Sequence, residues 1–452
     1  MKQDLCSCSI AELGRGLRQR AFSVREITEA HLARIDAVNP VVHAFILIDS
    51  EGARAAADAA DRELAQGQDR GTLHGVPLTL KDLFATRAQR TTAGSRILEE
   101  HVTPQDAVVV QRLRQEGAII LGKTNLNEFA FGATGINARY GTVRNPWDTD
   151  RIVGGSSSGA AAAVAAGMCV AALGTDTGGS VRIPAALTGL VGFKPTYDRV
   201  PRDGVIPLSW TLDHVGVLSR HVADACDVFG CVGNRPPHGP LEKVPLKGLR
   251  IGVLEQYCSD LDGSVGQYWE QFLRAAAGAG ARVVSLDFQR SREIVAASTV
   301  IMFAEAAASH LTWLRTCREL YGNDTKLRLL QGALYPAVTY LRAQQMREEI
   351  IHDVAGLFEQ VDILACPTQP CVAAKISDVR PEIVLQIVRN TRLAPLLGLP
   401  ALSVPLQCAG LPVGGQFVGP RGRDEYLLGV GVAVEDLIDT ARTPAKLAAG
   451  GN

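Results

Sequence analysis

Three stretches of this 452-residue sequence contain residues that could carry out chemistry. The first is HGVPLTLKDLF, in which apolar residues alternate up to Leu80 and Lys81 follows where the predicted strand ends. A lysine in this place can be a solvated strand end. A buried lysine, in contrast, tends to lose its charge, and a neutral lysine is a competent base. Lys81 is therefore a candidate general base.

The second stretch is VGGSSSGAAAAVAAG, residues 153–167. Its glycines allow a tight turn close to a ligand, and the N-terminus of the helix that follows points at this loop. The same letters fit G-x-S-x-G, the nucleophile elbow of α/β-hydrolases, with Ser157 as nucleophile. That motif needs a later histidine as base, and no later histidine lies in a Gly-flanked loop after a clear strand. The histidines that follow Ser157 are His214, His221, His238, His310 and His352. This hypothesis therefore rests on the motif alone.

The third stretch is LGTDTGGSVRIPAALTGLVGFKPT, residues 173–196. It contains a turn in which successive N–H groups can converge on one point, as an oxyanion hole requires, with a serine hydroxyl beside them. The turn consists of Thr177, Gly178, Gly179 and Ser180. An ordinary Gly-Gly turn is the alternative interpretation of the same letters.

A fourth stretch, GAIILGKT at residues 117–124, matches the phosphate-binding pattern G-x-x-x-x-G-K-[ST]. In a P-loop the residues between the two glycines form a turn that wraps phosphate oxygens. Here they are apolar and largely β-branched, which is typical of a buried strand. The following TNLNEFAFG also lacks the periodicity of a phosphate-binding helix. We therefore expect a structural strand, and a nucleotide-dependent enzyme with Lys123 on a phosphate is the alternative.

Composition favours a small-molecule partner. The chain has 46 basic and 47 acidic residues, a balance that indicates neither nucleic acid nor an anionic membrane as partner. The N-terminus lacks the apolar run of a signal peptide, and no stretch reaches the roughly 20 apolar residues of a membrane span. The ten cysteines form no C-x-x-C pair and have no histidine at metal-ligand spacing. We expect a reduced, cytoplasmic chain without metal or cofactor.

Helix and strand signals alternate along the chain, which predicts an α/β architecture around a largely buried sheet. A capping box at Ser23 and Glu26 predicts a helix that ends at Asn39-Pro40. Further helices are predicted over residues 51–67, around DAVVVQRLRQEG and over the apolar run 159–173. Strands are predicted at PLTLK, AIILGK, LRIGVL, ARVVSLDF, VDILACPT, ALSVPL and GGQFVGP. The Pro- and Gly-rich residues 234–248 form the one linker-like stretch.

Together these motifs resemble the amidase signature family. The resemblance rests on PLTLKD, GGSSSG and DTGGSVRIPAA, with Ser180 placed 24 positions after Ser156. It extends through GKTNLNEFAFG, RNPWD, GFKPT and GVIPLSWTLDHVG, and returns in DILACPT and GLPALSVP. It implies an α/β fold with a central, mostly buried mixed β-sheet covered on both faces by α-helices. An N-terminal helical segment (1–70) would pack on a catalytic core (71–235), and residues 236–452 would complete the same domain.

The resemblance also implies a mechanism, in which a carboxamide C–N bond is hydrolysed through an acyl-enzyme on Ser180. Lys81 would be the base and Ser156 the bridging serine, preceded by a cis peptide bond. The N–H groups of residues 177–180 would stabilise the oxyanion. Asp176 and Arg182, which flank this turn, are expected to hold it by hydrogen bonds. The residues that we expect to bind a small amide substrate are Gly132, Gly155, Trp210 and Arg392. The resemblance implies no cofactor or metal, and leaves a homodimer open.

Several departures bear on the substrate. The family includes the A subunit of glutamyl-tRNA amidotransferase, in which an acidic residue before the GLP motif helps to hold glutamine. Val388 stands in that place here, which favours an independent amide hydrolase over the amidotransferase subunit. Further alternatives are a hydrolase of a urea-like amide such as a biuret derivative, and a non-catalytic scaffold. Arg389 and Arg392 could each bind a substrate carboxylate or be a surface charge, and the surface interpretation is favoured for Arg389. Asp198 replaces a usual glycine and must fit a turn, and Trp210 could narrow or line the substrate pocket.

Overall fold

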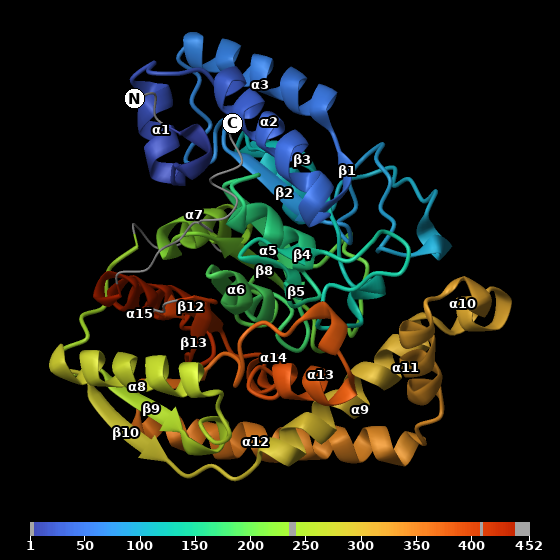
Figure 1. The fold of residues 1–452 in the computed structure, drawn as a ribbon, viewed down its shortest axis with the longest axis vertical. Helices are drawn as coiled ribbons and strands as arrows, with labels where there is room; N and C mark the ends of the chain where they lie inside the picture. Colours follow the sequence, from blue (N-terminus) through green and yellow to red (C-terminus); the bar gives the residue numbers. More distant parts are fainter. Residues whose placement is uncertain (1–3, 235–240, 407–409, 439–452) are drawn as a thin grey trace.

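The protein is built around one large mixed β-sheet with helices on both faces (Figure 1). The computed structural model describes residues 4–234, 241–406 and 410–438. In this part of the chain, eleven strands follow the order β1-β3-β2-β6-β8-β7-β12-β13-β11-β9-β10. They are β1 (Phe45–Ile48), β2 (Pro77–Lys81), β3 (Ile119–Thr124), β6 (Ala171–Asp176), β7 (Val191–Lys194), β8 (His214–Ser219), β9 (Arg250–Leu254), β10 (Arg282–Leu286), β11 (Ile363–Pro367), β12 (Ala401–Leu406) and β13 (Val413–Val418). β4 (Arg144–Asn145) and β5 (Asp148–Ile152) form a separate pair.

Parallel pairs form two groups in the sheet, separated by a block of antiparallel pairs. β2 pairs in parallel with both β3 and β6, and β9 pairs in parallel with both β10 and β11. Antiparallel pairs lie between these two groups, and β7 pairs with β12 there. The predicted mixed sheet is therefore confirmed. Hydrogen bonds between β7 and β12 join the two halves of the chain within this one sheet.

Helices cover both faces of the sheet. α5 and α6 pack on one face of its centre, and α7 and α15 pack on the other (Figure 1). The helices are α1 (Ile10–Arg18), α2 (Val24–Val42), α3 (Ser50–Ala65), α4 (Val108–Gln115), α5 (Ser158–Ala165), α6 (Arg182–Thr188), α7 (Val222–Val232), α8 (Gly263–Gly278), α9 (Ser291–Ser309), α10 (Leu311–Thr316), α11 (Asn323–Ala333), α12 (Ala337–Gln360), α13 (Pro381–Val388), α14 (Leu393–Leu397) and α15 (Asp424–Leu437).

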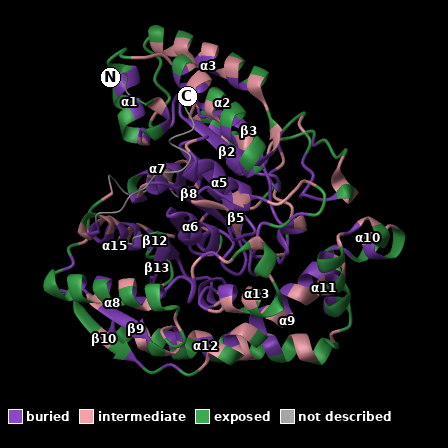
Figure 2. Ribbon diagram, in the orientation of Figure 1, coloured by how far each residue is buried: buried purple, intermediate pink, exposed green. Residues whose placement is uncertain are grey.

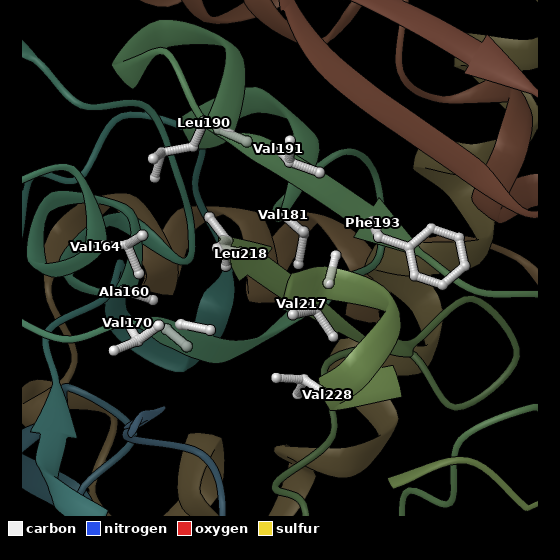
Figure 3. Close-up of a cluster of buried hydrophobic side chains, with 14 of the residues drawn as sticks. Ala160, Val164, Val170, Val181, Leu190, Val191, Phe193, Val217, Leu218 and Val228 are labelled. Carbon is white, nitrogen blue, oxygen red and sulfur yellow. The ribbon is translucent and has the colours of Figure 1, made fainter. Parts of the chain in front are cut away.

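The centre of the molecule is its most deeply buried part (Figure 2). Every residue of β2, β3, β6 and β8 is buried, as expected for strands covered on both faces. Val164 of α5, Val217 and Leu218 of β8, and Val228 of α7 contribute to one apolar cluster (Figure 3). The elements that carry Lys81 and the serine loop are thus fixed by this core, because close-packed interiors resist displacement.

Two sequence predictions of helices were wrong in their extent. The apolar run 159–173 is not one helix, because α5 ends at Ala165 and β6 begins at Ala171. Gly167 lies between them with φ +70°, a left-handed conformation that ends a helix readily. α2 begins at the predicted capping box but continues through Pro40 to Val42. Pro40 and Asp36, four residues earlier, are both exposed, so water can satisfy the carbonyl that proline leaves without a donor.

Two further findings concern the chain as a whole. No helix in the described residues is long and apolar enough to cross a membrane. The nine cysteines in the described part are free thiols. Cys408 and residues 235–240 of the predicted linker lie outside the described residues.

Candidate active site

Lys81 lies at the end of β2 and is completely buried. Its Nζ is 2.8 Å from Ser156 Oγ, 2.8 Å from Thr175 Oγ1 and 3.1 Å from Ser157 Oγ. Burial lowers the pKa of the lysine from 10.5 to about 7, although the charges of Asp213 and Asp176 oppose the shift. A substantial fraction of this lysine is therefore neutral at neutral pH, surrounded by hydroxyl groups.

Residues 153–157 form the serine loop. The hydroxyl groups of Ser156 and Ser157 both contact Lys81, and that of Ser157 is also hydrogen-bonded to β6. The peptide bond between Gly155 and Ser156 is cis. Ser157 Oγ donates to the Thr175 carbonyl (3.2 Å) and accepts from the Thr175 N–H (3.3 Å), so it is tied to β6. Among the described hydrogen bonds, none joins Ser157 to a histidine. His214 Nδ1 instead faces the carbonyl of Leu212 at 2.7 Å. The arrangement gives no support to the nucleophile elbow.

Ser180 lies in the turn between β6 and α6, which Asp176 and Arg182 hold together. Asp176 accepts from the N–H groups of Gly179 (2.8 Å) and Val181 (3.2 Å). Arg182 binds the same carboxylate through Nε and Nη2, at 3.0 and 2.9 Å. Although burial alone would raise it, the guanidinium holds the pKa of Asp176 well below its usual value. The two residues therefore play the structural role predicted for them.

Residues 177–180, which we call the nucleophile turn after the predicted role of Ser180, contain three N–H groups without a described hydrogen-bond acceptor. The described hydrogen bonds give no acceptor to the N–H of Thr177, Gly178 or Ser180, whereas the Gly179 N–H is engaged by Asp176. The Ser157 N–H donates to the Ser180 carbonyl at 3.1 Å, which joins this turn to the serine loop. The segments that carry Lys81, Ser156 and Ser180 are thus held next to one another.

Gly132 and Gly155, two of the predicted substrate-binding residues, both pack against Asn127. A Cβ atom at Gly132 would lie 2.6 Å from Asn127 Nδ2, and one at Gly155 would lie 2.3 Å from Asn127 Oδ1. Asn127 Oδ1 accepts from the Gly135 N–H (2.9 Å), and Nδ2 donates to the Ile136 carbonyl (3.0 Å). Both glycines are therefore required for this close packing, whatever else they contact.

Trp210 lines a cavity near Lys81. A cavity of about 460 Å³ is lined largely by residues between 198 and 215, together with Thr175, which contacts Lys81 Nζ. Trp210 lines this cavity and is 45% exposed. Asp213 also lines it, and accepts from Thr177 Oγ1 at 2.6 Å. The departure at Asp198 is accommodated nearby, because its φ of 64° is left-handed and its carboxylate pairs with Arg202.

The two candidate arginines have different surroundings. Arg389 donates to the Ser259 carbonyl (2.7 Å) and to Asn390 Oδ1 (3.1 Å). Arg392 lies against the nucleophile turn, since a Cβ atom at Gly178 would be 2.7 Å from its Nη1. Arg389 therefore has a structural role, and Arg392 is the arginine placed beside the predicted nucleophile.

Comparison with known proteins places this geometry in a family. A family model described as Amidase matches residues 26–428. The A subunit of glutamyl-tRNA(Gln) amidotransferase from Acidothermus cellulolyticus is 38% identical, over 96% of this chain and 94% of that protein. The chain belongs to the amidase signature family. Peptide amidase from Stenotrophomonas maltophilia superposes on this chain with a TM-score of 0.84, at 31% identity over 97% of this chain and 98% of the other.

A second solved structure widens the range of relatives. It belongs to a protein complex that reveals the evolutionary origins of an s-triazine catabolic enzyme. Its TM-score is 0.89 and its identity 32%, over 95% of this chain and 98% of the other. The relatives of this chain therefore include a peptide amidase, a protein linked to s-triazine breakdown and an amidotransferase subunit.

The structure also indicates the role of Lys123. This side chain is completely buried, and its Nζ is 2.9 Å from Asp82 Oδ1 and 3.0 Å from Thr91 Oγ1. GAIILGKT contributes strand β3, as expected, and the lysine is a structural ion-pair partner. The nucleotide-dependent alternative has no support here. In the described residues, no group of histidine, cysteine and acidic side chains is placed to hold a metal ion.

Sequence reasoning missed three residues around the candidate site. Thr175 contacts Lys81, Asn127 packs against Gly132 and Gly155, and Asp213 accepts a hydrogen bond from Thr177. All three stand within motifs that the sequence makes evident, in LGTDTGGS, TNLNEF and WTLDHVG. The motifs give no signal of which polar residue touches which, because those contacts form only when the strands are paired.

Proposed function

We propose that this chain hydrolyses the C–N bond of a carboxamide, with Ser180 as nucleophile, Ser156 as proton relay and Lys81 as base. The observation that carries the proposal is the contact of 2.8 Å between Lys81 Nζ and Ser156 Oγ, at a lysine whose pKa is lowered to about 7. A serine hydroxyl is a weak nucleophile until a neighbour removes its proton. A lysine that is neutral near pH 7 can do so through the intervening serine.

In the first half-reaction, Ser180 Oγ attacks the carbonyl carbon while its proton passes to Ser156 Oγ and the Ser156 proton passes to Lys81. The N–H groups of Thr177, Gly178 and Ser180 stabilise the oxyanion. The Gly179 N–H does not contribute, because it donates to Asp176. The C–N bond then breaks as the relay returns a proton to the leaving nitrogen. Water cleaves the acyl-enzyme by the same relay and releases the acid.

Ammonia release from a panel of small amides tests this proposal. We expect turnover by the wild type to fall by at least about 1,000-fold in Ser180→Ala and in Lys81→Met, because members of a catalytic unit fail together. Ser157→Ala is the matched control, since Ser157 also contacts Lys81 but has no role in the relay. Equal turnover by Ser180→Ala and wild type would contradict the proposal.

A second candidate is glutamine hydrolysis as the A subunit of a tRNA-dependent amidotransferase. The curated relatives favour it over an independent hydrolase, because several of them, at 36–40% identity, are named as that subunit. Against it stands Val388, which is buried in an apolar cluster with Ala133 and Ile183, at the position of the expected acidic residue. Both candidates use the same nucleophile and relay, so the identity of the amide distinguishes them.

Including glutamine and biuret in the amide panel separates the candidates. An amidotransferase subunit releases ammonia from glutamine in preference to simple carboxamides, and a partner subunit raises that rate. An independent hydrolase turns over another amide without any partner. Preferential turnover of biuret would instead favour the urea-like substrate class, to which the relative linked to s-triazine breakdown draws attention.

A further inference from the structure

Arg392 is anchored directly on the nucleophile turn. The preceding residue, Thr391, donates its hydroxyl to the Gly178 carbonyl at 2.7 Å. The Arg392 side chain passes beside Gly178, where a Cβ atom would be 2.7 Å from Nη1 and 3.3 Å from Cδ. α14, which Arg392 precedes, lies beside α9, and Met302 of α9 contacts Nη1 through its sulfur at 3.7 Å (Figure 1). The guanidinium thus lies next to Gly178, one of the proposed oxyanion donors.

This guanidinium has no anionic partner among the residues that the structure describes. Its Nε is buried without a hydrogen-bond acceptor, and the thioether at Nη1 is a weak acceptor. Arg182, which is completely buried, forms an ion pair with Asp176 instead. A guanidinium partly withdrawn from water without a counter-charge is costly, so the half-buried, unpaired Arg392 beside the proposed nucleophile indicates that a ligand supplies the charge.

A second arginine, Arg328, adds positive charge near Arg392. Burial, and next the nearby charge of Arg328, lower the pKa of Arg392 from 12.5 to about 10. Arg328 of α11 donates through Nη1 to the Phe131 carbonyl, next to Gly132, and its Nη2 pairs with Asp324 at 2.8 Å. Two guanidinium groups close to one another repel, and a bound anion would reduce this electrostatic repulsion.

We propose that Arg392, supported by Arg328, binds a carboxylate on the acyl part of the substrate, so that the preferred substrates are ω-carboxamides of short dicarboxylic acids. This inference rests on the proposed function. The chain between the two groups must be short, because Arg392 Nη1 lies against Gly178, one of the oxyanion donors. Val388 offers no carboxylate for an ammonium group, and the arginines repel one. Succinamate and water would give succinate and ammonium, whereas glutamine, with its α-ammonium, would be a poorer substrate.

Matched pairs of amides test the inference. Succinamate and butyramide differ in a carboxylate against a methyl group, as do glutaramate and pentanamide. We expect kcat/KM of the wild type to be at least about 30-fold higher for each anionic amide, the scale of a desolvated charge pair. Arg392→Gln should reduce that ratio at least about tenfold and Arg392→Lys should retain part of it. Arg389→Gln is the control that leaves the ratio unchanged, because Arg389 bonds to Ser259 and Asn390.

A binding measurement supplies a second readout. Succinate should protect Ser180 from a fluorophosphonate in the wild type and in Arg389→Gln, but not in Arg392→Gln, with folding checked by circular dichroism. Equal kcat/KM for succinamate and butyramide, or equal protection of Arg392→Gln and wild type by succinate, would overturn the inference. Turnover of butyramide in the same experiment would show that the proposed function still holds. Failure of every amide together with an unlabelled Ser180 would overturn both.

Discussion

At the scale of single residues, the proposed mechanism depends on a lysine whose pKa is lowered by burial to about 7. Lys81 Nζ is within 3.1 Å of three hydroxyl groups, and no carboxylate forms an ion pair with it in the described part of the chain. Lys123, on the neighbouring strand, is buried equally but forms an ion pair with Asp82. Two buried lysines one strand apart thus have different partners, and only Lys81 has the surroundings of a base.

The pH dependence of turnover follows from the Lys81 pKa. Burial lowers this pKa from 10.5 to about 7, so the neutral, proton-accepting form predominates above pH 7 and the ammonium below it. We predict that kcat/KM for a neutral amide rises with pH up to about 7, about tenfold per pH unit on the acid side, and then levels off. Measured profiles between about pH 5 and about pH 9 check this. A flat profile would exclude Lys81 as the base.

The charge of Asp213 affects the pH at which this acid limb falls, in the direction opposite to burial. Its carboxylate raises the pKa of Lys81, because a nearby negative charge favours the ammonium form. Although burial raises the pKa of Asp213 itself to about 6, the residue is mainly ionised at pH 7. Asp213→Asn should therefore shift the acid limb of kcat/KM to lower pH. Asp198→Asn, on the same cavity but paired with Arg202, should leave the limb in place. An identical limb in both variants would contradict this.

At the scale of elements, close contacts between helices can be tested with two glycines. α11 packs so closely on α9 at Gly332 that a Cβ atom at this position would lie 1.9 Å from the Phe303 carbonyl oxygen. Gly332→Ala should lower the free energy of unfolding by about 1–3 kcal/mol, since the helices must separate. Gly356 in α12 has open space around it, so Gly356→Ala should raise the free energy of unfolding by up to about 1 kcal/mol. Urea unfolding measures both, and changes of the same sign would refute the crossing.

The buried ion pair of β3 is a second test at this scale. Lys123→Met leaves the buried Asp82 carboxylate unpaired, which should lower the free energy of unfolding by about 3–5 kcal/mol. Arg274→Met is the control, because its pair with Glu270 is about 70% exposed and should change stability by no more than about 1 kcal/mol. The two costs come from urea unfolding, and Mg-ATP should bind neither variant nor wild type. A small cost for Lys123→Met together with ATP binding by the wild type would restore the P-loop hypothesis.

The sequence predicts the elements unevenly, for physical reasons. β2 and β3 can be recognised because apolar residues alternate or run together between clear breaks. The start of β6 is wrongly predicted as part of a helix, since Ala and Gly do not distinguish a buried strand from a buried helix. The capping box at Ser23 predicts the start of α2. The helix continues past Pro40 because the face of α2 that carries Pro40 is exposed, which the sequence alone does not reveal.

At the scale of the whole molecule, the site is assembled from distant segments. Lys81, Ser156 and Ser180 come from the first half of the chain, whereas Arg392 comes from the second. Gln416 of β13 contacts Arg182, which braces the nucleophile turn across the sheet. Motifs could predict the first three residues, because each motif is local. The unpaired state of Arg392 could not be predicted, since it depends on which side chains the folded second half brings near it.

The most direct test of the central claim is peptide mapping by mass spectrometry after exposure to a small fluorophosphonate. The reagent reports on the assembled site, because the proposed mechanism requires an intact relay from Lys81 for Ser180 to react. We predict an adduct on Ser180 in the wild type and none in Lys81→Ala. An adduct on Ser157, or labelling of Ser180 that persists in Lys81→Ala, would contradict the relay. The absence of any adduct on either serine would favour a non-catalytic subunit.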